Sequence, residues 1–288
     1  MLAGRFASSR SHLEEVLTLY DPIYHRSVVH QAGIHPQVGA QIWLGIVLFC
    51  LGFPDQALTQ SNAAIAEARR LAHPPTLAGT VALGIRLLSL FGDNAALDER
   101  ADQLIAVATD QSLPHWGAMG TIYRGWVEVK NGNLVEGISL LRSGSAAYHA
   151  TGADSWTPHH LALLARACEI AEQVDEARAL LDDGLRIVER TGERWLEAEL
   201  YRHKGQVLLR QRKSGAAEQL YRKAQGVAEK QGAKLWELRA ATSLAQLWGE
   251  QGRRTEAHEL LTPVYGWFTE GFDTADLKAA KMLLDGLT

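Results

Sequence analysis

The chain has 288 residues, of which 47% are hydrophobic and 22% charged, and this composition is typical of a folded protein rather than a disordered or fibrous one. Its formal net charge of −4 offers no basic face to displace counterions from phosphates, so nucleic acid is not an expected partner. The most apolar run, Ile42 to Phe53, falls short of the roughly 20 residues that a membrane span requires. The N-terminus also lacks the apolar core of a signal peptide. We therefore expect a cytoplasmic protein without membrane contact.

An internal repeat of forty residues organises the sequence. One column of this repeat holds Gly52, Gly92, Gly132, Glu172, Arg212 and Gly252. The columns seven residues before it and five residues after it hold mostly small residues, for example Gly125 and Gly137. Antiparallel helices approach closely only where the crossing side chains are small, and a glycine between them supplies the turn. Each repeat is therefore predicted to be a helical hairpin.

In chain order, a partial repeat over 11–35 comes first, with a helix near 11–20 that is broken at Asp21-Pro22 and a second helix near 22–32. Six hairpins fill 36–272. Their first helices are predicted near 37–51, 76–91, 116–130, 156–171, 195–211 and 235–250. Their second helices are predicted near 54–71, 94–111, 134–150, 174–190, 214–230 and 254–269.

The second helices have a common stop position. In the later hairpins this position is glycine, at Gly152, Gly192 and Gly232, and a left-handed glycine ends a helix. In the first two hairpins Ala72 and Ser112 stand there instead. Prolines follow them, at 74 and 114, and are predicted to stop those two helices in place of glycine.

A last amphipathic helix is predicted over Thr274 to Leu287, within a C-terminal segment 273–288. Such a helix caps the apolar end that a terminal repeat would otherwise expose. The predicted fold class is all-α, a right-handed α-α superhelix of about six hairpins with N-terminal helices and a C-terminal capping helix. The whole chain, 1–288, is predicted to be one solenoid domain.

The spacing of small residues resembles the tetratricopeptide (TPR) pattern, as at Gly45, Gly52, Ala57 and Ala64, although this repeat is longer than the usual one of about 34 residues. Three stretches, 191–209, 237–248 and 260–284, further resemble the C-terminal repeat regions of large bacterial proteins that join a nucleotide cyclase or other output domain to a signal-transducing ATPase. This resemblance implies a sensor or regulatory arm, with any catalytic domain upstream of the repeats.

The sequence holds no recognisable catalytic or cofactor motif, because phosphate-binding glycine loops and a G-x-S-x-G nucleophile turn are both absent. The eleven histidines lack the three- or four-residue spacing of helical metal ligands. Cys50 and Cys168 are interpreted as buried small side chains. We therefore expect no enzyme activity, no cofactor and no metal. A column of tryptophans, at Trp116, Trp156 and Trp236 with Trp195 one position off, is interpreted as a packing ladder.

The candidate partner-binding groove follows from the exposed face of the first helices, which lines the concave surface of such solenoids. The register places on that face Arg86, Trp126, His159, Arg166, Arg202, Gln206, Arg239 and Gln246. Arginine binds carboxylates bidentately, so this face would suit an acidic peptide or a chain terminus, with Trp126 as an apolar anchor. In the alternative interpretation, Arg166 and Arg202 pair with Glu169 and Glu199 and keep the surface soluble.

Three functions are compatible with these patterns. The first is a non-catalytic scaffold for a protein or peptide partner, as the regulatory arm of a larger bacterial signalling ATPase or cyclase. The second is a receptor for a small ligand, with a pocket around Trp126. The third is self-association through an uncapped end. The sequence does not choose a partner.

Overall fold

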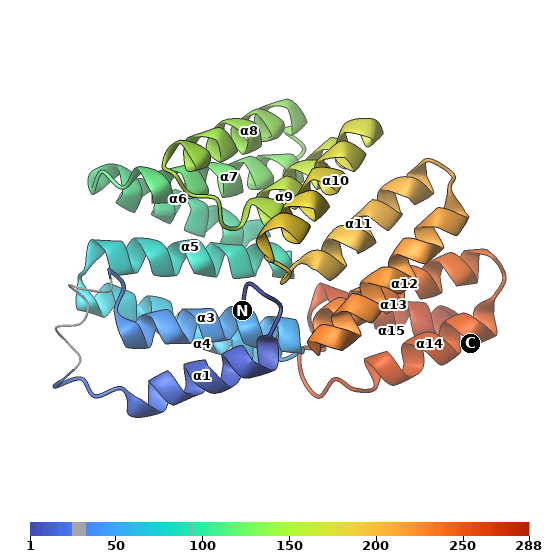
Figure 1. The fold of residues 1–288 in the computed structure, drawn as a ribbon, viewed down its shortest axis with the longest axis horizontal. Helices are drawn as coiled ribbons and strands as arrows, with labels where there is room; N and C mark the ends of the chain where they lie inside the picture. The colour runs from blue at the N-terminus through green and yellow to red at the C-terminus, as the bar shows by residue number, and fades with distance from the viewer. Residues whose placement is uncertain (25–32, 93, 288) are drawn as a thin grey trace. The chain divides into compact units, whose positions relative to one another are not determined.

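The computed structural model describes residues 1–24, 33–92 and 94–287. Within these ranges the regular structure consists of 14 α-helices without a strand (Figure 1). The chain divides into two compact units. We call Ala7–Phe49 with Asp55–Ser155 the N-terminal unit, and Trp156–Thr288 with Met1–Phe6 and Cys50–Pro54 the C-terminal unit.

The N-terminal unit is made of α1 and three helical hairpins. In each hairpin the two helices are joined by a short turn, and α5 also packs against α7 of the following hairpin. The long first helices are strongly apolar, and α5 is buried along most of its length. The helices are α1 (Phe6–Leu19), α3 (Pro36–Leu51), α4 (Pro54–Leu71), α5 (Pro74–Phe91), α6 (Asn94–Asp110), α7 (Pro114–Lys130) and α8 (Leu134–Ala150).

The C-terminal unit contains three further hairpins and a last helix. The first helices α9, α11 and α13 pack against one another, and α15 packs on α13 and α14. Two distant segments join this unit: the carbonyl oxygen of Leu2 accepts a 2.9 Å hydrogen bond from the backbone of Trp195, and the ring of Phe53 packs on Trp267. The helices are α9 (Thr157–Ile170), α10 (Val174–Thr191), α11 (Glu197–Arg210), α12 (Ser214–Gln231), α13 (Lys234–Glu250), α14 (Arg254–Tyr265) and α15 (Ala275–Leu287).

The hairpin helices lie where the repeat predicts them, to within two residues at almost every end. The exception is α14, which was predicted to run to residue 269 but ends at Tyr265. Its interior Pro263 has no N–H to donate, and the helix stops two residues later. At the N-terminus, α1 begins earlier than predicted, at the fully buried Phe6. Of the helix predicted near 22–32, residues 22–24 form a turn and 25–32 lie outside the described residues.

Left-handed residues occupy every place in the turn column, whether or not the residue is glycine. Glu172 has φ of 60° and Arg212 has φ of 59°, beside φ of 94° at Gly132. Ala72 and Ser112 at the stop position of the second helices are left-handed as well. The expectation that proline stops these two helices was therefore wrong. The left-handed residue ends the helix, and the proline that follows begins the next one, where its missing N–H costs nothing.

The small columns bring helix backbones into contact, as the repeat predicts. A Cβ atom added at Gly125 in α7 would lie 2.7 Å from the backbone nitrogen of Leu141 in α8. One added at Gly137 in α8 would lie 2.7 Å from the carbonyl oxygen of Gly125. Only a residue without a side chain fits at these crossings.

The last helix caps the C-terminal unit as expected. Its buried side is formed by Leu277, Ala280, Leu284 and Leu287. Its opposite side is solvated, and Met282 there is 75% exposed. Among the described residues, one helix, α5, is long and apolar enough to cross a membrane, and 72% of that stretch is buried inside the protein. Burial of this kind is typical of a core helix.

Candidate partner-binding face

A cluster of charged side chains connects the first helices of the C-terminal unit. We call it the arginine cluster, and it consists of Arg166 on α9, Glu199 and Arg202 on α11, Arg239 on α13 and Asp276 on α15. The side chains of α9, α11 and α13 meet because the forty-residue register brings equivalent positions of successive first helices side by side, and Asp276 joins them from the capping helix. Three guanidinium groups therefore gather around two of the unit's carboxylates.

Glu199 lies at the centre of the cluster, with only 2% of its surface exposed. Arg202 donates two hydrogen bonds to its carboxylate, of 2.6 and 2.9 Å, and Arg239 donates a third of 3.1 Å. Arg239 also forms a two-bond pair with Asp276, at 2.8 Å for each bond. These bidentate contacts are the strong form of the arginine–carboxylate pair, and they fix the positions of α11, α13 and α15 relative to one another.

Burial and the neighbouring charges shift the pKa of the Glu199 carboxyl in opposite directions. Burial alone would raise the pKa of its carboxyl, but the charges of Arg202 and Arg239 outweigh that effect and hold the pKa well below its usual range. Glu199 is therefore ionised near neutral pH. For a buried carboxylate, that state requires the surrounding guanidinium groups.

Arg166 lies where positive charge is in excess. Burial, followed by the nearby cations of Arg202 and Arg239, lowers the pKa of Arg166 to about 10. Glu199 and Glu169 act in the opposite direction but do not outweigh these effects. Arg166 stays protonated at neutral pH, and an additional carboxylate beside it would stabilise its charge.

His203 completes the electrostatic environment of the cluster, with 6% of its surface exposed. Its Nε2 atom is 3.6 Å from a carboxylate oxygen of Glu199, and neither ring nitrogen has a hydrogen-bond partner among the described residues. Burial first, and then the charge of Arg202, lowers the pKa of His203 well below its usual value. The imidazole is therefore neutral at physiological pH.

Two polar side chains extend the face beyond the cluster. Gln206 follows Arg202 by one helical turn on α11 and is half-buried. Gln246 on α13 is exposed and donates a hydrogen bond to Glu250. Together with the accessible edges of Arg202 and Arg239, which keep 11% and 14% of their side chains exposed, they offer donors to a partner.

Three of the residues expected on the exposed face are buried: Arg86 is 1% exposed, and Trp126 and His159 are 2% exposed. The expectation that they line an open groove was wrong. Arg86 lies on α5, which is covered on nearly all sides, and it bonds to the hydroxyl of Tyr123. His159 packs its ring on Trp195, with 5.6 Å between centroids.

One half of the alternative pairing of this face is confirmed, because Arg202 pairs with Glu199. Glu169 accepts a 2.7 Å hydrogen bond from Arg210 on α11. Sequence reasoning missed Asp276, because the capping helix lies outside the register that located the other members. It also took Glu199 for a surface residue, since a register gives the position of a side chain but not its burial.

The tryptophan column forms a packing ladder in the C-terminal unit. The rings of Trp156 and Trp195 are 5.1 Å apart, and those of Trp195 and Trp236 are 6.4 Å apart. The buried carboxylate of Glu193 accepts hydrogen bonds from the backbone of Trp156 and from the indole of Trp195. These three rings are therefore structural and are not available to stack on a ligand.

The described residues contain no group of three or more His, Cys, Asp or Glu side chains arranged to hold a metal ion. Cys50 and Cys168 are both buried and form no disulfide bond, as expected for small core side chains. Burial raises the pKa of the Cys50 thiol, which keeps it protonated and unreactive.

Solved structures of other proteins share the fold of this chain. No family model matches the sequence, and no curated protein does. Among solved structures, the apo form of RapI matches with a TM-score of 0.57 at 11% identity, over 97% of this chain and 91% of that one. The APC/C hetero-tetramer Cut9-Hcn1 matches with 0.54 at 12% identity, over 99% of this chain and 53% of that one. BtubC (BKLC) from P. vanneervenii matches with 0.51 at 13% identity, over 80% and 87%.

The chain has the all-helical α-α superhelical fold. At these identities the matches show the α-α superhelical fold alone.

Proposed function

We propose that the chain is a non-catalytic scaffold that binds an acidic peptide or protein segment on the first-helix face of the C-terminal unit. The observation that carries this proposal is the position of Arg166 in the cluster, where burial first, and then the charges of Arg202 and Arg239, lower its pKa. A partner carboxylate placed there would relieve the repulsion from these charges and form charge-assisted hydrogen bonds. Gln206 and Gln246 would then bond to the peptide backbone or to polar side chains.

The arrangement divides the arginines by role. Arg239 is committed to Glu199 and Asp276, and Arg202 to Glu199, so both mainly hold the scaffold together. The pKa of Arg166 is lowered whereas that of Arg239 is raised, so a partner carboxylate would stabilise the charge of Arg166 more. A substitution there separates partner binding from folding better than one at Arg239.

The test uses two labelled peptides that differ only in replacement of every Glu by Gln, with binding followed by fluorescence anisotropy. The wild-type chain is expected to bind the Glu peptide, and salt should weaken this binding because it screens exposed charges. The Arg166→Gln variant should lose at least about tenfold in affinity, equivalent to roughly 1.4 kcal/mol. Gln206→Ala should lose less, because it removes only neutral hydrogen bonds.

The matched control is Arg186→Gln. It removes the same charge from α10, where the Arg186 side chain is 78% exposed and pairs with its helix neighbour Asp183. Equal binding by the Arg166 and Arg186 variants would contradict the proposal. So would equal binding of the Glu and Gln peptides to the wild-type chain.

We also propose the wider setting that the sequence resemblance implies, a regulatory arm of a bacterial signalling ATPase or cyclase acting in the cytoplasm, with 1–288 as one solenoid domain. Its support is the likeness of 191–209 and 260–284 to such arms. In a parent protein that carries the ATPase or cyclase domain, the Glu peptide should change the rate of nucleotide turnover. An unchanged rate at a saturating peptide concentration would contradict this setting while leaving the scaffold proposal standing.

A further inference from the structure

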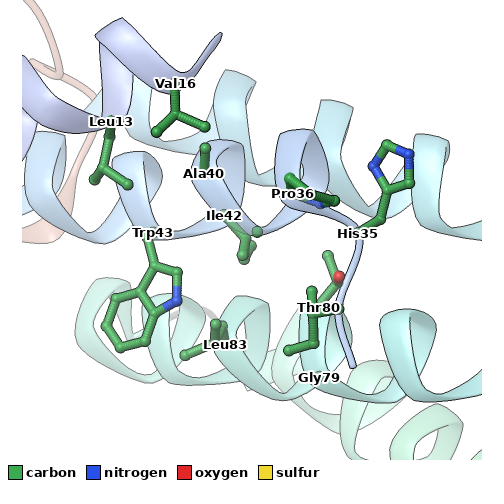
Figure 2. A pocket seen from close by; sticks show the side chains of 12 residues that line it. Leu13, Val16, His35, Pro36, Ala40, Ile42, Trp43, Gly79, Thr80 and Leu83 are labelled. Atoms are coloured by element: carbon green, nitrogen blue, oxygen red, sulfur yellow. The ribbon is translucent and has the colours of Figure 1, made fainter. Parts of the chain in front are cut away.

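A second candidate site lies in the N-terminal unit. Its lining is mostly apolar, unlike the charged arginine cluster. It is a pocket of about 240 Å³ between α1, α3 and α5 (Figure 2). Leu13 and Val16 of α1 form one side of it, and Trp43 of α3 and Leu83 of α5 lie opposite. The pocket is open to solvent beside Val16, which is 41% exposed.

Small residues on the helices make room for this pocket. Gly39 and Ala40 present almost no side chain on the turn of α3 that faces α1, and Gly79 does the same on α5. Several other helix crossings of the chain use glycine to bring two backbones into contact, as Gly125 does in α7. At Gly39 a Cβ atom would meet only the side chain of Ile34, at 3.6 Å, so close helix packing does not account for this glycine.

The lining is mostly apolar, and its polar side chains include Thr80, whose hydroxyl donates to the carbonyl oxygen of Thr76, and His35. No Asp, Glu, Lys or Arg lines the pocket, so a charged ligand would find no counter-ion there. The polar end is His35, which is 2% exposed and bonds through Nε2 to the Tyr20 hydroxyl at 3.0 Å. Its Nδ1 atom is buried without a hydrogen-bond partner among the described residues.

A buried imidazole nitrogen without a partner carries a cost that a bound ligand would remove. Burial lowers the pKa of His35, so the ring is neutral at pH 7 and offers one donor and one acceptor. The Tyr20 hydroxyl satisfies one of them. A ligand with one polar group at that end would satisfy the other, and its apolar remainder would face Leu13, Trp43 and Leu83.

The volume sets the size of the occupant. A dry cavity of about 150 Å³ lined by apolar side chains holds benzene, and pockets for drug-sized ligands begin near 300 Å³. A pocket between these limits accepts one or two fused rings. We propose that this pocket binds a small, neutral, mostly apolar ring compound of about the size of indole, with one hydrogen-bonding group directed to His35.

The experiment titrates the full chain with 5-fluoroindole and follows the ¹⁹F resonance of the probe, which the protein's own eight tryptophans do not obscure. Saturable binding with a dissociation constant below about 1 mM is expected. Ala40→Phe, which fills the pocket, should weaken binding at least about tenfold. Ala63→Phe is the matched control, because Ala63 is exposed on α4 and does not line the pocket.

Binding to wild type that Ala40→Phe leaves unchanged would overturn the proposal, as would the absence of saturable binding. A second measurement covers the case in which Ala40→Phe fails to fold. Intermolecular nuclear Overhauser effects from the probe to the methyl groups of Leu13, Val16 and Leu83 are expected in the wild-type chain. Effects only to methyl groups elsewhere would place the probe outside the pocket and would equally overturn the proposal.

Discussion

The two units use the same repeat register but place different chemistry on their first helices. In the N-terminal unit α3 has no charged residue and α5 has only Arg86. In the C-terminal unit α11 carries five charged residues in 14: Glu197, Glu199, Arg202, Lys204 and Arg210. The repeat thus fixes where side chains stand, and the residue types at those places decide what each unit can bind. One unit offers an apolar pocket and the other a charged face.

The two units should also differ in the interactions that stabilise each of them. Four changes of sequence or pH test this difference. The largest effect is expected from Glu199→Gln in the C-terminal unit, because it leaves Arg202 and Arg239 without their buried carboxylate. Breaking a buried pair from one side costs about 3–5 kcal/mol. Urea unfolding should show that loss, and hydrogen exchange should locate it in α11, α13 and α15.

The control for that change is Glu259→Gln, at an exposed position of α14 in the same unit. It should alter stability by less than about 0.5 kcal/mol, as surface substitutions usually do. If Glu199→Gln is no worse than this control, the cluster does not stabilise the unit and the contrast between the units is lost.

In the N-terminal unit the most damaging change should be Gly125→Val, because its side chain would collide with the backbone of α8 at Leu141 and Gly137. Overpacking of this kind costs about 1–3 kcal/mol or more. Faster hydrogen exchange is expected in α7 and α8, with α11 and α13 unaffected. Gly117→Ala on the same helix is the control, since its Cβ would meet only Ala108, at 3.6 Å. Equal stability of the two variants would rule out backbone contact as the reason for glycine.

A smaller effect should appear on acidification, and mainly in the C-terminal unit. The pKa of His203 is lowered in the folded state, so below about pH 6.5 the unfolded chain binds more protons and stability falls as pH falls. The groups around it are Arg166 on α9, Glu199 and Arg202 on α11, and Arg239 on α13. The lowered pKa of Glu199 adds a second loss below about pH 4.3, with the same sign.

Unfolding midpoints of the wild-type chain and of His203→Phe, measured from pH 8 to pH 5, test this directly. The variant should lose the part of the decline near pH 6.5 that the imidazole of His203 contributes, while His35 and His115, whose pKa values burial also lowers, keep their part. Parallel pH profiles for the two proteins would show that His203 contributes nothing to the pH dependence of stability, which would contradict this prediction.

The smallest expected effect is a gain in stability. Arg212→Gly should stabilise the C-terminal unit by about 1 kcal/mol, since a left-handed conformation is unfavourable for residues with a Cβ atom. Thermal unfolding is sensitive enough to detect it. The reverse substitution, Gly132→Ala at the same column in the N-terminal unit, should destabilise by a similar amount. No change in either variant would mean that the turn column imposes no backbone strain.

The sequence predicted those features that depend on the register alone. It located the twelve hairpin helices and the turns between them, including the turns at Glu172 and Arg212, which the structure shows to be left-handed. It failed where burial depends on neighbours outside the repeat. Arg86 and His159 stand at the right register but are covered, and Asp276 meets Arg239 from a capping helix that the register does not include.

The apolar pocket could not be predicted from the sequence, for the same reason. It exists because α1 lies over α3 and α5, and no repeat column relates α1 to those helices. The small residues Gly39 and Gly79 were visible, but small residues elsewhere in the chain mark close helix packing. Only the position of α1 shows that Gly39 borders a space instead, whereas a Cβ atom at Gly79 would lie 2.8 Å from the side chain of Ile34.

The most direct test of the account is a crossed binding measurement on the full chain, with the Glu peptide and 5-fluoroindole titrated against Arg166→Gln and Ala40→Phe. The account predicts that Arg166→Gln weakens the peptide at least about tenfold and leaves 5-fluoroindole unchanged, and that Ala40→Phe does the reverse. If either substitution weakened both ligands equally, or neither ligand, the assignment of an acidic partner to the arginine cluster and a neutral ring compound to the pocket would be contradicted.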